Sequence, residues 1–283
     1  MTLLVGLSPE ARDDAGGAIG LAARLAGAWD EDLTVAVVVT PGTETDPATA
    51  DGGDPEPPAI AHAAVDGVLA GTDLAVRWTT VRGRSVADAL VEAAGADGVS
   101  AIVLGTDPDR SGRIAVRVAR SSPVPVVLAR GTGAAPGMPV TRVTCAFDGT
   151  TASSAVLAAA ADLARRSSAT LRVASFAVRR RAAIPPEVGL DAEEPVIAEW
   201  SEQIGAAQKA ALAEQGLEAE TGVHAGAGWD EAVHAAGWTA GDLLVVGGTP
   251  GAATRFFLGD RVGAILAAAP VPAVIVRGER SDG

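Results

Sequence analysis

The residues best suited to chemistry lie in one glycine-rich stretch near the C-terminal end of the sequence. Residues 247–260 read GGTPGAATRFFLGD, follow the apolar run 242–247 and precede a helix-like apolar pattern at 261–269. This order predicts a strand, a loop and the start of a helix. A helix N-terminus presents unpaired N–H groups and a positive dipole end, and glycines let the backbone approach an anion closely. The stretch therefore predicts an anion site, with a simple tight turn as the alternative.

The remaining candidates for catalysis or metal binding do not form a recognised pattern. His224 and His234 lie ten residues apart without a cysteine, a third histidine or a tightly spaced carboxylate pair, unlike the ligand set of a zinc site. Ser153 and Ser154 stand in no Gly-x-Ser-x-Gly turn. The single cysteine, Cys145, lies in the apolar run VTCAF, so we expect a buried, unreactive thiol. We therefore expect neither catalytic residues nor a metal site, and no enzyme activity.

Composition and charge are typical of a folded, acidic chain of about two domains. The 283 residues are 48% hydrophobic and 20% charged, with a formal net charge of −13. That charge argues against a nucleic-acid partner, which requires a basic face. The N-terminus lacks a basic and apolar leader, and Pro270 and Pro272 cut the last apolar stretch short of the ~20 residues that span a membrane. We expect a cytoplasmic protein without a membrane partner.

The elements that would position the glycine-rich loop alternate between strand and helix. In the first half we predict helices after Pro9, at 58–70, at 86–94 and from 112, and strands at 3–8, 33–39, 74–81, 101–105 and 123–130. Residues 40–58 are expected to form a surface loop and 131–139 a linker. In the second half we predict helices at 152–165, 196–215, 229–236 and after the loop, and strands at 143–147, 171–178, 216–224, 243–247 and 271–277.

The two halves are copies of one unit. Residues 121–131, SSPVPVVLARG, align with residues 268–278, AAPVPAVIVRG, at an offset of 147, and six of the eleven positions are identical. Buried strands that alternate with helices predict two tandem, doubly wound, Rossmann-like α/β domains, 1–131 and 140–283, each with a parallel sheet. Ligands of such sheets bind beyond the carboxyl ends of the strands, where the strand order reverses. Asp148 and the glycine-rich loop both lie at such ends.

These residues resemble a known family. The segment FDGT at 147–150, followed by GGTP, FFLGD and VPAVIV, resembles the universal stress protein domain, whose pattern is a strand-terminal Asp-Gly-Ser and a later Gly-x2-Gly-x9-Gly-Ser/Thr. The resemblance covers nearly the whole chain, twice. It implies an adenine-nucleotide alpha-hydrolase-like fold that binds ATP or AMP. The residues it implies are Asp148 on the ribose side and, around the phosphates, Gly247, Gly248, Gly251, Gly259 and Asp260.

The resemblance also implies how the halves associate. In the family the last strands pair across a dimer interface, so the segments PVPVV and PVPAV suggest that the two halves form an intrachain pseudo-dimer. A further homodimer of the whole chain is left open.

The departures from the family pattern bear on the ligand. Only seven residues separate Gly251 from Gly259, Pro250 offers no N–H to a phosphate, and Asp260 stands at the Ser/Thr position. A carboxylate ~4 Å from a phosphate repels it by several kcal/mol at an intermediate dielectric. Alternatively, Asp260 serves as a helix cap or as a ligand of Mg²⁺. The first half lacks Asp-Gly-Ser and carries Arg113 at the Ser/Thr position, so we expect no nucleotide there.

Three functions are compatible with these residues. The first is stress-linked sensing, with at most weak adenine-nucleotide binding in the C-terminal half. The second is a nucleotide-free scaffold or protein-interaction module of the same fold. The third, an adenylating enzyme of the PP-loop type, lacks an SGGxDS-like loop. Arg179, Arg180 and Arg181 either contact phosphate or form a solvated loop.

Overall fold

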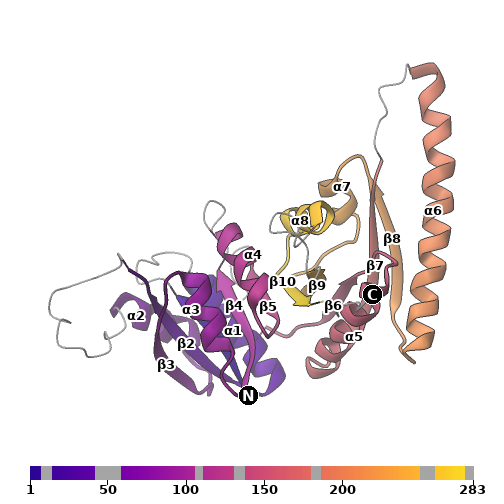
Figure 1. Cartoon of the computed structure of the whole chain (residues 1–283). Helices are drawn as coiled ribbons and strands as arrows, with labels where there is room; N and C mark the ends of the chain where they lie inside the picture. Colours follow the sequence, from indigo (N-terminus) through magenta and orange to yellow (C-terminus); the bar gives the residue numbers. More distant parts are fainter. Residues whose placement is uncertain are drawn as a thin grey trace. The chain divides into compact units, whose positions relative to one another are not determined.

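The chain forms two compact units, Met1–Val140 and Thr141–Gly283 (Figure 1). The computed structural model describes residues 1–7, 15–41, 59–105, 111–130, 138–179, 186–248 and 259–277. Within these ranges, no helix combines the length and the apolar character needed to cross a membrane.

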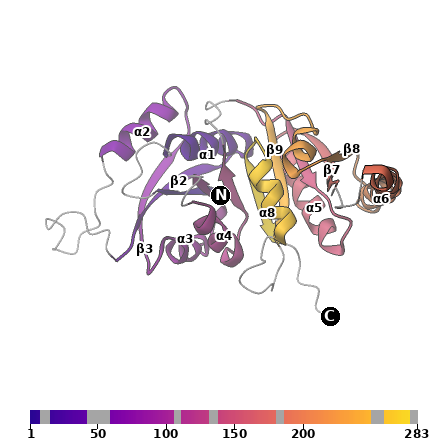
Figure 2. The same ribbon diagram turned by 90° about the horizontal axis from the view of Figure 1, so that it is seen from above.

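The first unit is a parallel sheet with two helices on each face. Its elements are β1 (Thr2–Leu7), α1 (Ala15–Trp29), β2 (Asp32–Val39), α2 (Ala59–Leu69), β3 (Val76–Arg82), α3 (Val86–Ala94), β4 (Val99–Gly105), α4 (Ser111–Ser121) and β5 (Val126–Ala129). The strands lie in the order β3-β2-β1-β4-β5 and pair in parallel. Seen from above, α1 and α2 lie on one side of the strands, and α3 and α4 on the other (Figure 2).

The second unit repeats this arrangement. Its elements are β6 (Arg142–Ala146), α5 (Thr151–Arg166), β7 (Thr170–Val178), α6 (Pro186–Glu214), β8 (Glu220–Gly226), α7 (Trp229–His234), β9 (Asp242–Gly248), α8 (Gly259–Ala268) and β10 (Ala273–Arg277). The strands lie in the order β10-β9-β6-β7-β8, the equivalent of the first unit. Helix α5 packs against β6, β7 and β9, and α7 packs against β7, β8 and α8. The predicted pair of doubly wound α/β units is therefore confirmed.

The central strands are buried on both faces, as their continuous apolar runs predict. Leu3, Leu4 and Val5 of β1 are at most 2% exposed, and Val143 and Cys145 of β6 are fully buried. Helices on both faces remove these side chains from water, at about 1.5 to 3 kcal/mol for each large one. The strand order reverses between β1 and β4 in the first unit and between β6 and β9 in the second.

Two elements differ most from the sequence prediction. Helix α6 begins at Pro186, ten residues before the predicted start. A proline is compatible with the first turn of a helix, because the N–H that it lacks would have no intrahelical partner there. Strand β8 begins at Glu220 rather than at Gly216. Gly216 has φ +64°, and the N–H of Leu217 donates to the carbonyl of Leu212, so these residues form the end of α6. Most of the predicted loop at 40–58 and linker at 131–139 lies outside the described residues.

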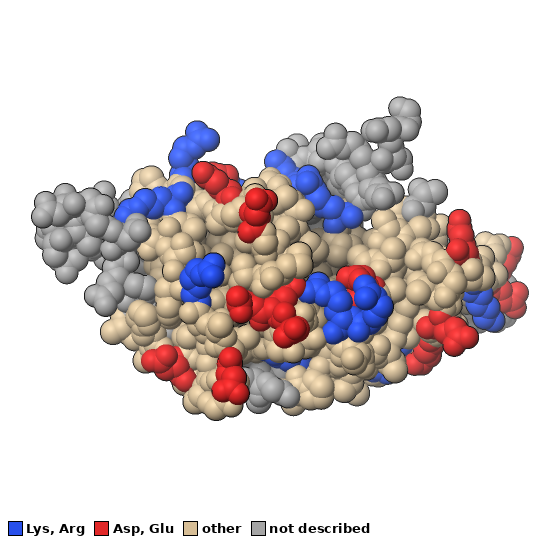
Figure 3. All heavy atoms as spheres, turned by 90° about the horizontal axis from the view of Figure 1, so that it is seen from below, with Lys and Arg blue, Asp and Glu red and all other residues tan. Residues whose placement is uncertain are grey.

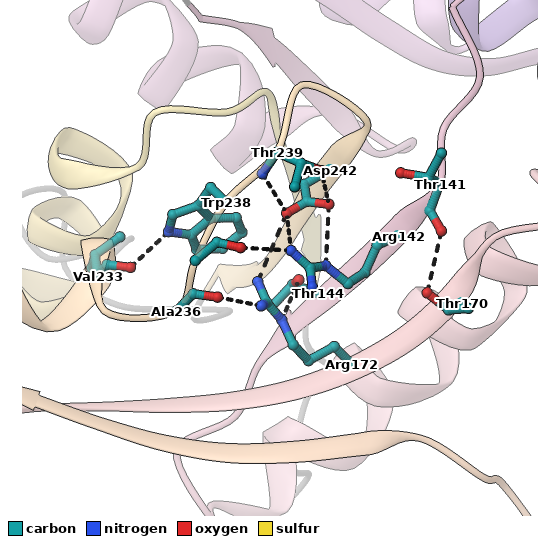
Figure 4. Close-up of polar contacts among 11 residues, drawn as sticks. Thr141, Arg142, Thr144, Thr170, Arg172, Val233, Ala236, Trp238, Thr239 and Asp242 are labelled. Atoms are coloured by element: carbon teal, nitrogen blue, oxygen red, sulfur yellow. Dashed lines mark hydrogen bonds and ion pairs between the residues drawn. The ribbon is translucent and has the colours of Figure 1, made fainter.

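A buried charged cluster lies at the amino ends of β6, β7 and β9 (Figure 4). The Asp242 side chain is fully buried and accepts hydrogen bonds from Arg142 Nε at 3.1 Å and Nη2 at 2.6 Å. Thr239 donates its backbone N–H at 3.0 Å and its hydroxyl at 2.9 Å to the same carboxylate. Arg172 Nη2 lies 4.0 Å from Asp242, and its guanidinium stacks 4.9 Å from the Trp238 ring centre. One carboxylate thus faces two arginines away from water.

The first unit has a different polar cluster at the corresponding place. Thr2 and Thr34, which like Arg142 and Arg172 are the first and third residues of their strands, join their hydroxyls at 2.9 Å. The hydroxyl of Ser100 donates to the Glu31 carboxylate and, at 3.3 Å, to the carbonyl of Thr2. The polar groups at this end of the sheet are therefore hydroxyls and one carboxylate in the first unit, and mainly an aspartate with two arginines in the second.

Candidate functional site

The candidate site lies where the strand order of the second unit reverses. Strands β6 and β9 pair in parallel from Arg142 opposite Asp242 to Cys145 opposite Val245, so their carboxyl ends meet at one edge. Asp148 follows β6, and Gly247 and Gly248 end β9. Helix α8 begins at Gly259. Open α/β sheets bind their ligands in the crevice at such a reversal.

The Asp148 side chain is held by the first turn of α5. Its Oδ1 accepts hydrogen bonds from the N–H of Thr150 at 3.0 Å, the hydroxyl of Thr150 at 2.7 Å and the hydroxyl of Ser153 at 2.5 Å. The N–H of Asp148 in turn donates to Ser153 Oγ at 3.2 Å. Among the described residues nothing donates to Oδ2, and Asp148 is exposed. One carboxylate oxygen is therefore held at the start of α5, and the other makes no hydrogen bond with a described residue.

The local field keeps this carboxylate ionised. Partial burial acts to raise the pKa of Asp148, but the hydrogen bonds from Ser153 and Thr150 and the positive charge of Arg261 outweigh it and lower the pKa below its usual value. Arg261 belongs to the first turn of α8. A cation from α8 therefore influences the carboxylate that follows β6.

Gly247 has a packing reason to be glycine. A Cβ atom there would lie 2.7 Å from Cγ2 of Val156 in α5, closer than side chains approach one another. Gly248 is buried. Gly251 and the Asp260 side chain lie outside the described residues. Close packing of α5 on β9 therefore accounts for Gly247 without a ligand.

Three residues have supporting roles that the sequence analysis did not assign to them. Thr150 and Ser153 satisfy Oδ1 of Asp148, and the spacing Asp-x-Thr-x2-Ser at the start of α5 is the signal that could have indicated them. Arg261 had no such signal, because its influence on Asp148 depends on how α8 packs.

The corresponding edge of the first unit is only partly described. Gly6 near the end of β1 leaves room for Leu90, since a Cβ there would lie 2.8 Å from Leu90 Cδ1. Gly105 ends β4, and α4 begins at Ser111. The segments 8–14 and 106–110, which include the residues after both strands, lie outside the described residues.

Other sequence candidates fall elsewhere. Cys145 is fully buried, as predicted, and burial together with the Asp148 charge raises the pKa of its thiol to about 12. His224 stacks on Phe176 with ring centres 5.8 Å apart, and His234 Nδ1 contacts the Asp230 carbonyl at 2.7 Å. Across the described ranges, no three His, Cys, Asp or Glu residues cluster in a way that could hold a metal ion.

A hollow of about 620 Å³ lies away from the candidate site. It is bordered by the C-terminal half of α5, the start of β7 and the residues that lead into β8, namely Ala161, Ala164, Arg165, Ala169, Thr170, Leu171, Leu217, Glu218, Ala219 and Glu220. The hollow lies at the amino ends of β7 and β8, opposite the edge that carries Asp148. Its size alone does not make it the functional site.

Comparison with known proteins identifies one family. The model of the universal stress protein family matches residues 1–130 and 139–277. A universal stress protein of Mycobacterium tuberculosis (strain H37Rv) is 35% identical over 209 residues, which cover 69% of this chain and 70% of that protein. A universal stress protein structure from Archaeoglobus fulgidus has a TM-score of 0.61 at 12% identity, covering 99% of this chain and 97% of its own. Another, solved in complex with cAMP, covers 47% of this chain and 98% of its own at 26% identity and a TM-score of 0.38.

Proposed function

Because the chain belongs to the universal stress protein family and carries its domain twice, we propose that it is a stress-linked sensor whose second unit binds ATP or AMP with low affinity. The first unit is not proposed to bind a nucleotide. The proposed site residues are Asp148 on the ribose side and, around the phosphates, Gly247, Gly248, Gly251, Gly259 and Asp260.

The observation that carries this proposal is the state of Asp148. The pKa of its carboxyl is lowered, one oxygen is held by Thr150 and Ser153, and the other makes no hydrogen bond with a described residue. A carboxylate that is held through one oxygen at a sheet's switch point is suited to accept a hydrogen bond from a ribose hydroxyl with the other oxygen.

Charge at the start of α8 sets the proposed affinity. Asp260 opposes an incoming phosphate, and Arg261, the next residue, attracts it. Arg261 raises the local positive potential enough to help lower the pKa of Asp148. The two opposite charges in one helical turn support weak rather than tight nucleotide binding.

The rival function is a nucleotide-free scaffold. It is supported by Gly247, whose lack of a side chain is explained by Val156 packing alone. It is also supported by the replacement of the family's Ser/Thr by Asp260. Under this proposal Asp148 only stabilises the first turn of α5.

Calorimetric titration with Mg-ATP and with AMP separates the two proposals. Sensing predicts binding in the wild type and loss of binding in Asp148→Ala. It also predicts about tenfold weaker binding in Arg261→Gln, which corresponds to the loss of about 1.4 kcal/mol of charge attraction to the phosphates. Asp162→Ala, which removes an exposed carboxylate of the same unit, is the matched control and should bind as the wild type does. If millimolar nucleotide produces neither binding heat nor a thermal shift, the nucleotide-free scaffold is the supported function.

The role of Asp260 is tested by one further variant. Asp260→Ser restores the family's residue type and should tighten binding, because it removes a negative charge beside the phosphates. Weaker binding of Mg-ATP, with AMP unchanged, would instead support Mg²⁺ coordination by this carboxylate.

The remaining features are proposed from sequence. We propose domains 1–131 and 140–283, an intrachain pseudo-dimer through the segments PVPVV and PVPAV, and a cytoplasmic location without enzymatic or nucleic-acid-binding activity. On the face drawn in Figure 3, acidic and basic side chains lie in small groups, several of which touch one another. Light scattering distinguishes the monomeric chain from a further homodimer, and a nucleotide hydrolysis assay tests the absence of catalysis.

A further inference from the structure

Helix α6 contacts the Asp148 turn directly through Ile204. Gly149 has φ +79°, a conformation that favours glycine, and a Cβ built on it would lie 2.8 Å from Ile204 Cδ1. The end of the Ile204 side chain therefore fills the space over Gly149. Ile204 is 6% exposed, so its side chain makes this contact from the buried core.

A second connection reaches the residue before Asp148. Gln208, one turn after Ile204 on α6, is fully buried, and its Nε2 donates to Ser175 Oγ at 2.9 Å and to the Gly222 carbonyl at 3.0 Å. Ser175 Oγ donates at 2.6 Å to the carbonyl of Phe147. The path from Gln208 through Ser175 thus ends on the backbone of the residue that precedes Asp148.

The choice of glutamine at this buried position supports a specific role. Oε1 of Gln208 is buried and has no hydrogen-bond partner among the described residues. A buried acceptor without a partner is costly, and an apolar side chain of similar size would avoid that cost. The two bonds that Nε2 donates are what an apolar residue could not supply.

We infer that Ile204 and Gln208 of α6 are positioning residues for the proposed nucleotide site, because they hold the backbone on both sides of Asp148. Ile204 packs on Gly149, the residue after Asp148. Gln208 acts through Ser175 on Phe147, the residue before Asp148. This inference rests on the proposed function for its ligand, but the geometry of the turn can be measured without one. It also connects the site to a helix of 29 residues, whose N-terminal part extends beyond the ends of β7 and β8 (Figure 1).

The deciding experiment measures the pKa of the Asp148 carboxyl by NMR in variants of the full chain. Ile204→Val removes only Cδ1, the atom over Gly149, and Ser175→Ala removes the bond to Phe147. Both should raise the Asp148 pKa above its wild-type value, because a loosened turn weakens the hydrogen bonds from Thr150 and Ser153. Leu212→Ala is the control, since Leu212 is equally buried on α6, at 6% exposed, and lies two turns from Ile204. It should lower stability more than Ile204→Val and leave the Asp148 pKa unchanged.

Nucleotide titration separates this inference from the proposed function. If the wild type binds AMP, Ile204→Val should weaken binding about fivefold, and Leu212→Ala should not. If the wild type binds no nucleotide, the proposed function fails, and the pKa comparison still decides the inference. An Asp148 pKa that is unchanged in both Ile204→Val and Ser175→Ala overturns it, as does an equal shift in Leu212→Ala.

Discussion

Replacement of Asp242 by asparagine is expected to destabilise the second unit strongly. The carboxylate is fully buried, accepts two hydrogen bonds from Arg142 and two from Thr239, and faces Arg172, which is 3% exposed. Asp242→Asn preserves the shape but removes the charge and one acceptor oxygen. Burial and the Arg142 charge already lower the pKa of Arg172, with Asp242 opposing them. Removal of one partner of a buried ion pair costs about 3 to 5 kcal/mol.

Urea unfolding followed by circular dichroism, with calorimetry for the melting temperature, measures this cost. For a unit of this size, about 3 to 5 kcal/mol corresponds to a fall in melting temperature of roughly 10 °C or more. The control is Asp162→Asn, which breaks an exposed ion pair with Arg165 on α5 and should change stability by about 0.5 kcal/mol or less. A loss below about 1 kcal/mol in Asp242→Asn would refute the view that this carboxylate compensates the two arginines.

Three further predictions follow from the same unit. Gly247→Ala should cost about 1 to 3 kcal/mol through overpacking on Val156 and be partly rescued by Val156→Ala; loss of AMP binding without loss of stability would instead assign Gly247 to the ligand. The Cys145 thiol, with a pKa of about 12, should react with a thiol reagent at about pH 8 only when the protein unfolds, and rapid native labelling would contradict its burial. Because the folded-state pKa of Asp148 is lowered, its stabilising contribution should be complete above the ordinary aspartate pKa of about 3.9 and be lost as the pH falls through the lower folded value. Comparison of urea midpoints along this pH range should find that part of the pH dependence absent in Asp148→Asn, and an unchanged profile would argue against it.

The fold could be predicted from the sequence because the local patterns for helices and strands agree with the way in which the strands pair in the sheet. Helix α3, for example, is bounded by Ser85, whose side chain accepts from the N–H of Asp88 at 3.2 Å, and by Gly95. The apolar strands and the repeated C-terminal segment then fixed the order of elements in both halves. Helix α6 differed most from the prediction, because Pro186 and Pro195 suggest a loop when only the neighbouring residues are considered.

The position of the site at the sheet edge could be predicted from the sequence, but the tertiary contacts that form it could not. Asp148 follows an apolar strand, so its position at the sheet edge could be expected. The packing of Gly247 on Val156 joins residues about ninety positions apart, and the influence of Arg261 depends on how α8 lies on the sheet. The contact of Ile204 with Gly149 likewise arises from tertiary packing, which no local pattern of residues specifies.

The two polar clusters at the amino ends of the strands have a consequence for folding. In a chain that contains the same unit twice, a strand of one copy can pair within the sheet of the other. If β1 took the place of β6, Thr2 would stand where Arg142 binds Asp242, and a buried carboxylate would lose its closest cation. If β6 took the place of β1, Arg142 would enter a cluster of hydroxyls and one carboxylate, that of Glu31. The first exchange carries the cost of a buried charge without its partner, so the divergence of these clusters favours pairing of β6 with the strands of its own copy.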